Sequence, residues 1–294
     1  MKSLPKIKGT YRRNFSLSKL TWFQTGGKAE ILFLPKDLLD LQFFLKNIKN
    51  ISINIIGGGS NLLIRDGGIK GVVIKLGPGF DFVNFKKKYI LCGASVKNIN
   101  LSNKMTKRKI KGYEFLSTIP GTIGGSIFMN AGCFGKEIKN LVKSVIVLNK
   151  KGNLIELSKN LIDFKYRSSG INKNYFIVAT KLRISKGNVK NIRKSIKRFL
   201  NLRKKTQPNK VLTGGSTFIN PKRKKAWKLI KDSGCENMVV GGAKISDKHC
   251  NFLVNTGHAN SKDLETLIKK VRNQVFDKTG INLELELQII GKEK

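Results

Sequence analysis

The chain has 294 residues with 58 Lys and Arg against 18 Asp and Glu, a formal net charge of +40. Its 40% hydrophobic content is enough for buried cores, and the length allows one large domain or two to three smaller ones. No apolar run is long enough to span a bilayer, and no apolar segment follows the basic N-terminus, which excludes a membrane span and argues against a secretory signal. Four scattered cysteines without a CxxC pair, and two histidines, argue against a metal site and are typical of a cytoplasmic protein.

The positive charge is spread over the whole chain instead of forming one block. Lys, Asn and Ile are abundant together, which favours a compositional bias over a dedicated nucleic-acid surface. A basic surface of this kind still favours a small polyanionic ligand. We therefore expect no nucleic-acid partner, and a basic nucleic-acid-binding protein remains an alternative.

Hydrophobic periodicity predicts alternating strands and helices in the N-terminal part of the chain. The expected elements there are strands over residues 29–34, 51–56 and 71–76, with a helix capped by Asp37 after the first strand. Further along, the pattern predicts strands within 81–92, a basic helix over 97–110, a hairpin over 142–157 and a strand over 175–182.

The C-terminal part begins with an amphipathic basic helix from residue 189, which we expect to link two domains. A helix over 227–233 and a strand over 252–255 follow. The last helix is expected to be capped by Ser261 and to end at Gly280. After it, strict alternation over 281–289 predicts a strand with Glu284 and Glu286 on one face.

Two glycine-dense loops carry the strongest functional signal. Glycine lets a ligand approach the backbone, and successive N–H groups in such a loop bind anions. Leu62 replaces the third glycine of the dinucleotide fingerprint, and no GxxxxGK[ST] loop exists, which argues against both common nucleotide folds. The loops are ordinary turns or a less common phosphate cradle. Their candidate cofactor residues are Gly57, Gly58, Gly59, Ser60, Asn61 and Leu62 in the first loop, and Gly121, Thr122, Gly124, Gly125, Ser126, Asn130, Ala131 and Gly132 in the second.

Three further stretches can carry chemistry, although each alone is more simply a turn or a solvated face. Arg167 can clamp a carboxylate with its planar fork, and Ser216 offers a hydroxyl on a glycine turn. Glu284 and Glu286 form a carboxylate pair in a chain that is poor in acids. No side chain can supply a hydride, so reduction needs a bound redox cofactor, for which the glycine loops are candidates.

Taken in order, these segments resemble the UDP-N-acetylenolpyruvoylglucosamine reductase (MurB) family. Each stretch is weak alone, but the ordered set is specific and spans nearly the whole chain. The matching stretches are residues 14–26, 57–63, 112–135, 166–169, 215–221, 246–255 and 283–291.

The resemblance implies an α+β fold with a FAD-binding part of the vanillyl-alcohol-oxidase (PCMH) type. That part would span residues 14–187, with subdomains of about 14–78 and 79–187, and a substrate-binding α+β domain would span 188–294. The implied reaction is NADPH-dependent, FAD-mediated reduction of UDP-N-acetylglucosamine enolpyruvate to UDP-N-acetylmuramate. We expect the protein to be a cytoplasmic monomer without membrane insertion.

The resemblance also implies roles for individual residues. Ser216 matches the proton donor, Arg167 and Glu286 match the pair that stabilises the enolate, and Arg203 and Asn220 match positions near the substrate. Hydride would come from flavin N5.

Two departures from the family pattern stand out. Ile219 replaces a lysine common in relatives, and the short segment 170–174 resembles the subclass that lacks an inserted tyrosine loop. A different flavin oxidoreductase of the same fold, acting on sugar acids, remains an alternative.

Overall fold

The computed structural model describes residues 4–294, which fall into two compact units. Unit 1 contains the chain up to Arg12, Leu32–Gly58 and Val72–Arg203, and unit 2 contains Arg13–Ile31, Gly59–Gly71 and Lys204–Lys294. The sequence predicts two domains that meet after residue 187, and this division stays a prediction. The compact units differ from it because each contains separate stretches of the chain. The difference arises because β4 (Leu62–Ile64) pairs in parallel with β16 (Gln288–Ile290), which ties an early segment to the end of the chain.

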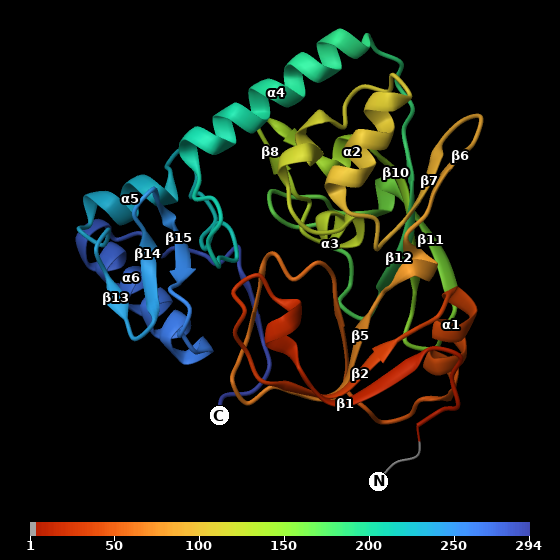
Figure 1. The fold of residues 1–294 in the computed structure, drawn as a ribbon, viewed down its shortest axis with the longest axis horizontal. Helices are drawn as coiled ribbons and strands as arrows, with labels where there is room; N and C mark the ends of the chain where they lie inside the picture. Colours follow the sequence, from red (N-terminus) through yellow and green to blue (C-terminus); the bar gives the residue numbers. More distant parts are fainter. Residues whose placement is uncertain (1–3) are drawn as a thin grey trace. The chain divides into compact units, whose positions relative to one another are not determined.

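The main sheet of unit 1 is antiparallel, with strand order β11-β10-β12-β7-β6. The predicted hairpin is confirmed, with Leu148 opposite Leu154. Helix α3 packs against β12 and β7 (Figure 1). The core of this unit contains residues such as Leu101, Ile123 and Val145. The elements are β6 (Val83–Phe85), β7 (Ile90–Gly93), α2 (Asn98–Lys107), α3 (Ile123–Phe128), β8 (Gly132–Cys133), β9 (Lys136–Glu137), β10 (Val142–Leu148), β11 (Leu154–Ser158) and β12 (Phe176–Leu182).

A second sheet has the order β1-β2-β5-β3, and the division between the units falls within three of its strands. Asp37 caps α1 as predicted, because its carboxylate accepts the Asp40 N–H at 2.9 Å. The elements are β1 (Thr10–Ser16), β2 (Lys28–Leu34), α1 (Leu38–Asn47), β3 (Ile53–Ile56) and β5 (Ile69–Lys75). Short 3₁₀ turns occupy Leu17–Leu20, Pro78–Phe80, Glu114–Thr118, Ile138–Asn140 and Lys159–Leu161.

The long basic helix predicted from residue 189 is α4 (Val189–Thr206). Only Ile192 and Phe199 of this helix are buried, and the Phe199 ring stacks on Phe134 with centroids 4.8 Å apart. The helix therefore attaches to unit 1 by a narrow apolar stripe.

Unit 2 contains a three-stranded antiparallel sheet of β13 (Val239–Val240), β14 (Ala243–Ser246) and β15 (His249–Asn255). Helix α5 (Ala226–Asp232) packs on β15, and α6 (Ser261–Thr279) packs on β13 and β14 (Figure 1). The predicted apolar stripe of α6 is buried, including Leu264, Leu267 and Val271.

Two C-terminal predictions need correction. The N-cap of α6 is Asn260, not Ser261, because Asn260 and Asp263 form a reciprocal capping box while the Ser261 hydroxyl donates to the Ile64 carbonyl. Regular strand structure covers only Gln288–Ile290 instead of 281–289, because the preceding residues bond to the Ser216 segment. Gly280 ends α6 in the left-handed region, as predicted. In the described part of the chain, no helix is both long and apolar enough to cross a membrane.

Candidate active site

In unit 1 the two glycine loops lie directly against each other. A Cβ on Gly58 would stand 2.6 Å from the Gly121 Cα, and a Cβ on Gly57 would stand 3.1 Å from the Thr122 Oγ1. The first loop follows β3. In the second stretch Gly121 and Thr122 precede α3, whereas Gly124, Gly125 and Ser126 lie in its first turns. The two stretches that the sequence left separate thus form one cradle. Glycine at position 58 is required by this close backbone approach.

Two lysines make the cradle positive. The Lys75 Nζ donates to the Gly57 carbonyl at 2.8 Å, and Lys97 forms a β-bridge with Thr122. Burial lowers the pKa of Lys75, and the nearby Lys97 charge lowers this pKa further. Neither lysine forms an ion pair with any residue in the range 4–294. Exposed backbone and unpaired cations fit the pyrophosphate of a dinucleotide such as FAD.

Buried side chains fix the second loop. Asn98 donates to Ser126 Oγ at 2.8 Å and to the Pro120 carbonyl at 3.1 Å. Its backbone N–H donates to the Gly121 carbonyl at 3.1 Å. The hydroxyl of Ser126 is therefore committed to Asn98 and contributes to loop geometry.

The remaining predicted residues of this loop serve its packing. A Cβ on Gly124 would approach the Ala94 Cβ to 2.9 Å, whereas Gly125 has only Thr122 Oγ1 nearby at 3.7 Å. Ala131 donates to the Ser126 carbonyl at 2.8 Å, and Gly132 pairs with Glu137. Of these positions, Gly125 has the most open surroundings.

The rest of the first loop belongs to unit 2. Gly59 has φ +68°, and a Cβ there would lie 1.9 Å from the Leu20 carbonyl oxygen. The Asn61 carboxamide donates to the Glu286 carbonyl at 2.9 Å. Leu62 begins β4 and pairs with Gln288. The loop is thus bonded directly to the segment that carries Glu286.

Ser216 and Glu286 lie on neighbouring segments of unit 2. Ser216 forms an antiparallel bridge with Phe252 of β15, and Glu286 donates its N–H to the Thr217 carbonyl at 2.9 Å. A Cβ on Gly215 would lie 3.9 Å from the Ser60 carbonyl oxygen. Unit 2 therefore brings together the end of the first glycine loop, Ser216 and Glu286. Ser216 and Glu286 are half-buried, whereas Glu284 is exposed.

Arg167 lies on a tight turn in unit 1. Its φ of +60° costs a non-glycine residue roughly 1–2 kcal/mol, so the surrounding structure must hold the turn. The Asn130 carboxamide donates to the Lys165 carbonyl at 2.8 Å, and the Ser169 hydroxyl donates to the Phe128 carbonyl at 2.9 Å. The Asn130 side chain is fully buried and also accepts the Lys139 N–H. Its side chain therefore supports the Arg167 turn, and its role in cofactor binding stays a prediction.

Arg167 and Arg203 both influence the Cys133 thiol. Burial raises the pKa of Cys133, while the positive charges of Arg203 and Arg167 act in the opposite direction. Burial also lowers the pKa of Arg203. Both arginines, which were predicted to act on the substrate, belong to unit 1, and their charges act on the same thiol. In unit 2, the Asn220 carboxamide oxygen accepts the Ala226 N–H at 3.0 Å and helps to start α5.

Sequence reasoning missed several supporting residues. Lys75 is one of 58 basic residues, and no spacing distinguishes it from the others. Asn98 and Asn251 act through hydrogen bonds to distant backbone groups, for which the sequence carries no periodic signal.

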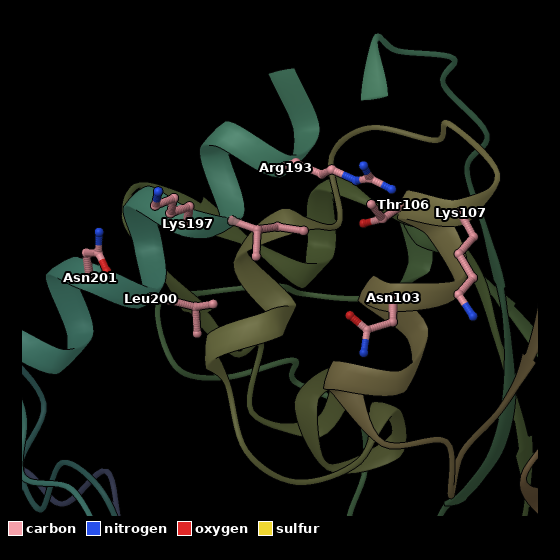
Figure 2. A pocket seen from close by; sticks show the side chains of 8 residues that line it. Asn103, Thr106, Lys107, Arg193, Lys197, Leu200 and Asn201 are labelled. Atoms are coloured by element: carbon pink, nitrogen blue, oxygen red, sulfur yellow. The ribbon is translucent and has the colours of Figure 1, made fainter. Parts of the chain in front are cut away.

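A pocket of about 500 Å³ lies elsewhere in unit 1, between α2 and α4. Figure 2 shows Arg193 extending from α4 toward Thr106 of α2. The lining of this pocket includes the cations Lys107, Arg193 and Lys197 but none of the predicted site residues. Within residues 4–294, no group of three His, Cys, Asp or Glu side chains could hold a metal ion.

Comparisons with known proteins match both parts of the chain. Residues 29–158 match the family described as "FAD binding domain", and residues 207–290 match "UDP-N-acetylenolpyruvoylglucosamine reductase, C-terminal domain".

Similar proteins cover the whole chain. The UDP-N-acetylenolpyruvoylglucosamine reductase of Rickettsia prowazekii (strain Madrid E) is 44% identical over 293 residues, covering 99% of both chains. That of Rickettsia conorii is 44% identical over 290 residues, covering 98% of both chains. The crystal structure of the enzyme (MurB) from Thermus caldophilus has a TM-score of 0.85 at 27% identity, covering 97% of this chain and 99% of that one.

Proposed function

Because the chain belongs to the UDP-N-acetylenolpyruvoylglucosamine reductase family, we propose that it reduces UDP-N-acetylglucosamine enolpyruvate to UDP-N-acetylmuramate. NADPH is the proposed reductant, and the product serves peptidoglycan precursor synthesis. The observation that carries this proposal is the grouping of Ser216, Glu286 and the end of the first glycine loop, from Gly59 on, within unit 2.

FAD is the proposed cofactor, held in unit 1 by the cradle of Gly57, Gly58, Gly121 and Thr122 with Lys75 beside it. Bound FAD supplies the hydride that none of the twenty side chains can provide. The cradle contributes backbone N–H groups and positive charge, and the absence of Cβ atoms permits close approach.

The chain's own residues handle the proton and the developing negative charge. Ser216 is the proposed proton donor to the carbon that becomes basic during the reduction. Arg167 and Glu286 are the proposed partners of the substrate carboxylate, where they stabilise the enolate, and preorganised groups of this kind supply the largest catalytic term in many enzymes. A serine hydroxyl is a weak acid, so this role requires a strongly basic intermediate and a site that excludes water.

Arg203 and Asn220 are proposed substrate contacts. We also propose that the enzyme is a cytoplasmic monomer; the four cysteines are free, which accords with a reducing compartment. Size-exclusion chromatography with light scattering tests the oligomeric state.

The proposed activity is tested by an absorbance spectrum followed by an NADPH oxidation assay. The expected result is a yellow protein whose NADPH oxidation depends on the enolpyruvyl nucleotide and yields the reduced product by mass spectrometry. A colourless protein that takes up no FAD contradicts the proposal. Turnover of sugar acids in place of the nucleotide would identify a different oxidoreductase of the same fold.

A further inference from the structure

Asn251, on strand β15 of unit 2, uses both ends of its carboxamide on one residue. Its Oδ1 accepts the Phe218 N–H at 2.9 Å, and its Nδ2 donates to the Phe218 carbonyl at 2.8 Å. Its own backbone carbonyl accepts the Thr217 N–H at 2.8 Å. The residue is only 4% exposed, so these bonds form away from competing water.

The opposite edge of the same segment is bonded to the last part of the chain. The Thr217 carbonyl accepts N–H groups from Glu286 at 2.9 Å and from Leu287 at 3.2 Å. The two residues that follow Ser216 are therefore held from both sides, by Asn251 and by the Glu286 segment.

The residues before Ser216 form a two-glycine turn, in which Gly214 packs against the Phe23 ring. Gly214 and Gly215 precede Ser216, and Gly215 has φ +80°, a region that glycine enters freely. The bridge between Ser216 and Phe252 of β15 is continued on the C-terminal side by the bonds of residues 217 and 218. The carboxamide of Asn251 fixes this segment because it bonds the Phe218 N–H and carbonyl, as a backbone peptide group of a neighbouring strand would.

We propose that Asn251 is a positioning residue that sets Ser216 for proton transfer by clamping residues 217–218. This inference rests on the proposed function, in which Ser216 is the proton donor. Asn251 itself contacts no reacting atom, and its effect is confined to the step that uses Ser216.

The test separates the two half-reactions by stopped-flow absorbance. Asn251→Ala should slow oxidation of the reduced enzyme by the enolpyruvyl nucleotide about 10- to 100-fold, the loss expected from a misplacement near 1 Å. Reduction by NADPH should stay within the roughly twofold scatter of an independent site. Equal slowing of both half-reactions, or of neither, overturns the proposal.

Asn255 provides a matched control on the same strand. It is 5% exposed and donates to the Phe23 carbonyl at 2.8 Å, but it makes no bond to residues 216–218. Asn255→Ala should lower the thermal midpoint without a selective loss in either half-reaction. If Asn255→Ala reproduces the selective loss, the effect is general destabilisation and the proposal fails.

A double variant tests whether Asn251 acts through Ser216. In a Ser216→Ala background, Asn251→Ala should produce little further slowing of the oxidative half-reaction, because the group being positioned is absent. Full multiplication of the two effects overturns the proposal. If Ser216→Ala alone leaves the oxidative half-reaction unchanged, the proposed function of Ser216 has failed instead.

Hydrogen exchange on the cofactor-free protein gives a readout independent of activity. Asn251→Ala should speed exchange of the Thr217, Phe218 and Glu286 amides while leaving the α6 core protected. Where Asn251→Ala does not fold, Asn251→Asp serves the same tests, because it keeps the acceptor for Phe218 N–H and loses the donor. Unchanged exchange at these amides in the folded variant contradicts the clamp.

Discussion

The Asn61 carboxamide donates a 2.9 Å hydrogen bond to the Glu286 carbonyl, although the two residues are 225 positions apart in the sequence. The Gln288 N–H returns a bond to the Asn61 carbonyl at 3.2 Å. The end of the first glycine loop and the segment of the proposed enolate-stabilising glutamate thus share one framework within unit 2. A substitution in this part of the loop is therefore expected to shift the backbone at Glu286.

Asn61→Ala should destabilise unit 2 and weaken the proposed reaction. Loss of a partly buried hydrogen bond is expected to lower the free energy of unfolding by about 0.5–1.5 kcal/mol. Urea denaturation of the cofactor-free protein measures this change. The matched control is Asn47→Ala on α1, where the amide bonds the Phe43 carbonyl at an exposed site; its effect should stay within about 0.5 kcal/mol.

Ser216→Ala should lower kcat by about 10²- to 10⁴-fold, the usual worth of a positioned proton donor. KM should change little, because the hydroxyl is proposed to act during proton transfer and not in binding. Steady-state assays with NADPH and the enolpyruvyl nucleotide measure both constants. A variant that keeps full turnover and loses only binding would show that Ser216 is not the proton donor.

Gly58→Ala should disrupt the cradle between the two glycine loops. The new Cβ would lie 2.6 Å from the Gly121 Cα, so the backbone must shift. This shift is expected to lower the free energy of unfolding by about 2 kcal/mol. We expect weaker FAD retention, measured by the flavin absorbance per protein after dialysis. Gly77→Ala is the control, because a Cβ there has nothing within 4 Å. Equal flavin content in Gly58→Ala and the unmodified protein would contradict the cradle.

Lys75→Gln should weaken FAD binding without destabilising the cofactor-free protein. The pKa of Lys75 is lowered in the fold, chiefly by burial, so its positive charge opposes folding at neutral pH. Removing the charge relieves that cost but also removes a cation beside the Gly57 carbonyl. Fluorescence titration and thermal unfolding measure the two effects. Lys70→Gln, an exposed position on the same strand, should leave FAD affinity unchanged.

The same lysine predicts a pH dependence for FAD binding. Because its pKa lies below the ordinary value of 10.5, Lys75 loses its charge at a lower pH than an exposed lysine. As the solution is made alkaline, FAD affinity should therefore begin to decrease at a pH lower than the one at which an exposed lysine loses its charge. In Lys75→Arg the fall should be reduced, since arginine stays charged. An identical pH profile in both proteins would exclude Lys75 as the titrating group.

Asn130→Ala should loosen the turn that carries Arg167. The change removes the partly buried bonds to the Lys165 carbonyl and from the Lys139 N–H, at a cost of about 0.5–1.5 kcal/mol. Substrate KM should rise more than the NADPH reduction rate falls, because Arg167 is proposed to hold the substrate carboxylate. An unchanged KM in a folded variant would separate the Arg167 turn from substrate binding.

Much of the local structure followed from the sequence. The hairpin ending at Leu148 and Leu154, the Asp37 cap and the Gly280 stop are set by residues within a few positions of one another. Predictions from neighbouring residues failed where a distant segment of the chain took the hydrogen bonds instead. Ser261 bonds the Ile64 carbonyl instead of capping α6, and residues 284–287 contact residues 217–219 instead of continuing a regular strand.

The sequence by itself determined the family, and it predicted the glycine loops and Arg167, Ser216 and Glu286 as site residues, because these depend on residue type and order. Only the tertiary structure decided which residues support them. Asn61, Asn130 and Asn251 act through hydrogen bonds to backbone groups far away in the chain, and any asparagine can make such a bond. Their partners exist only once the chain is folded, so no spacing in the sequence could identify them.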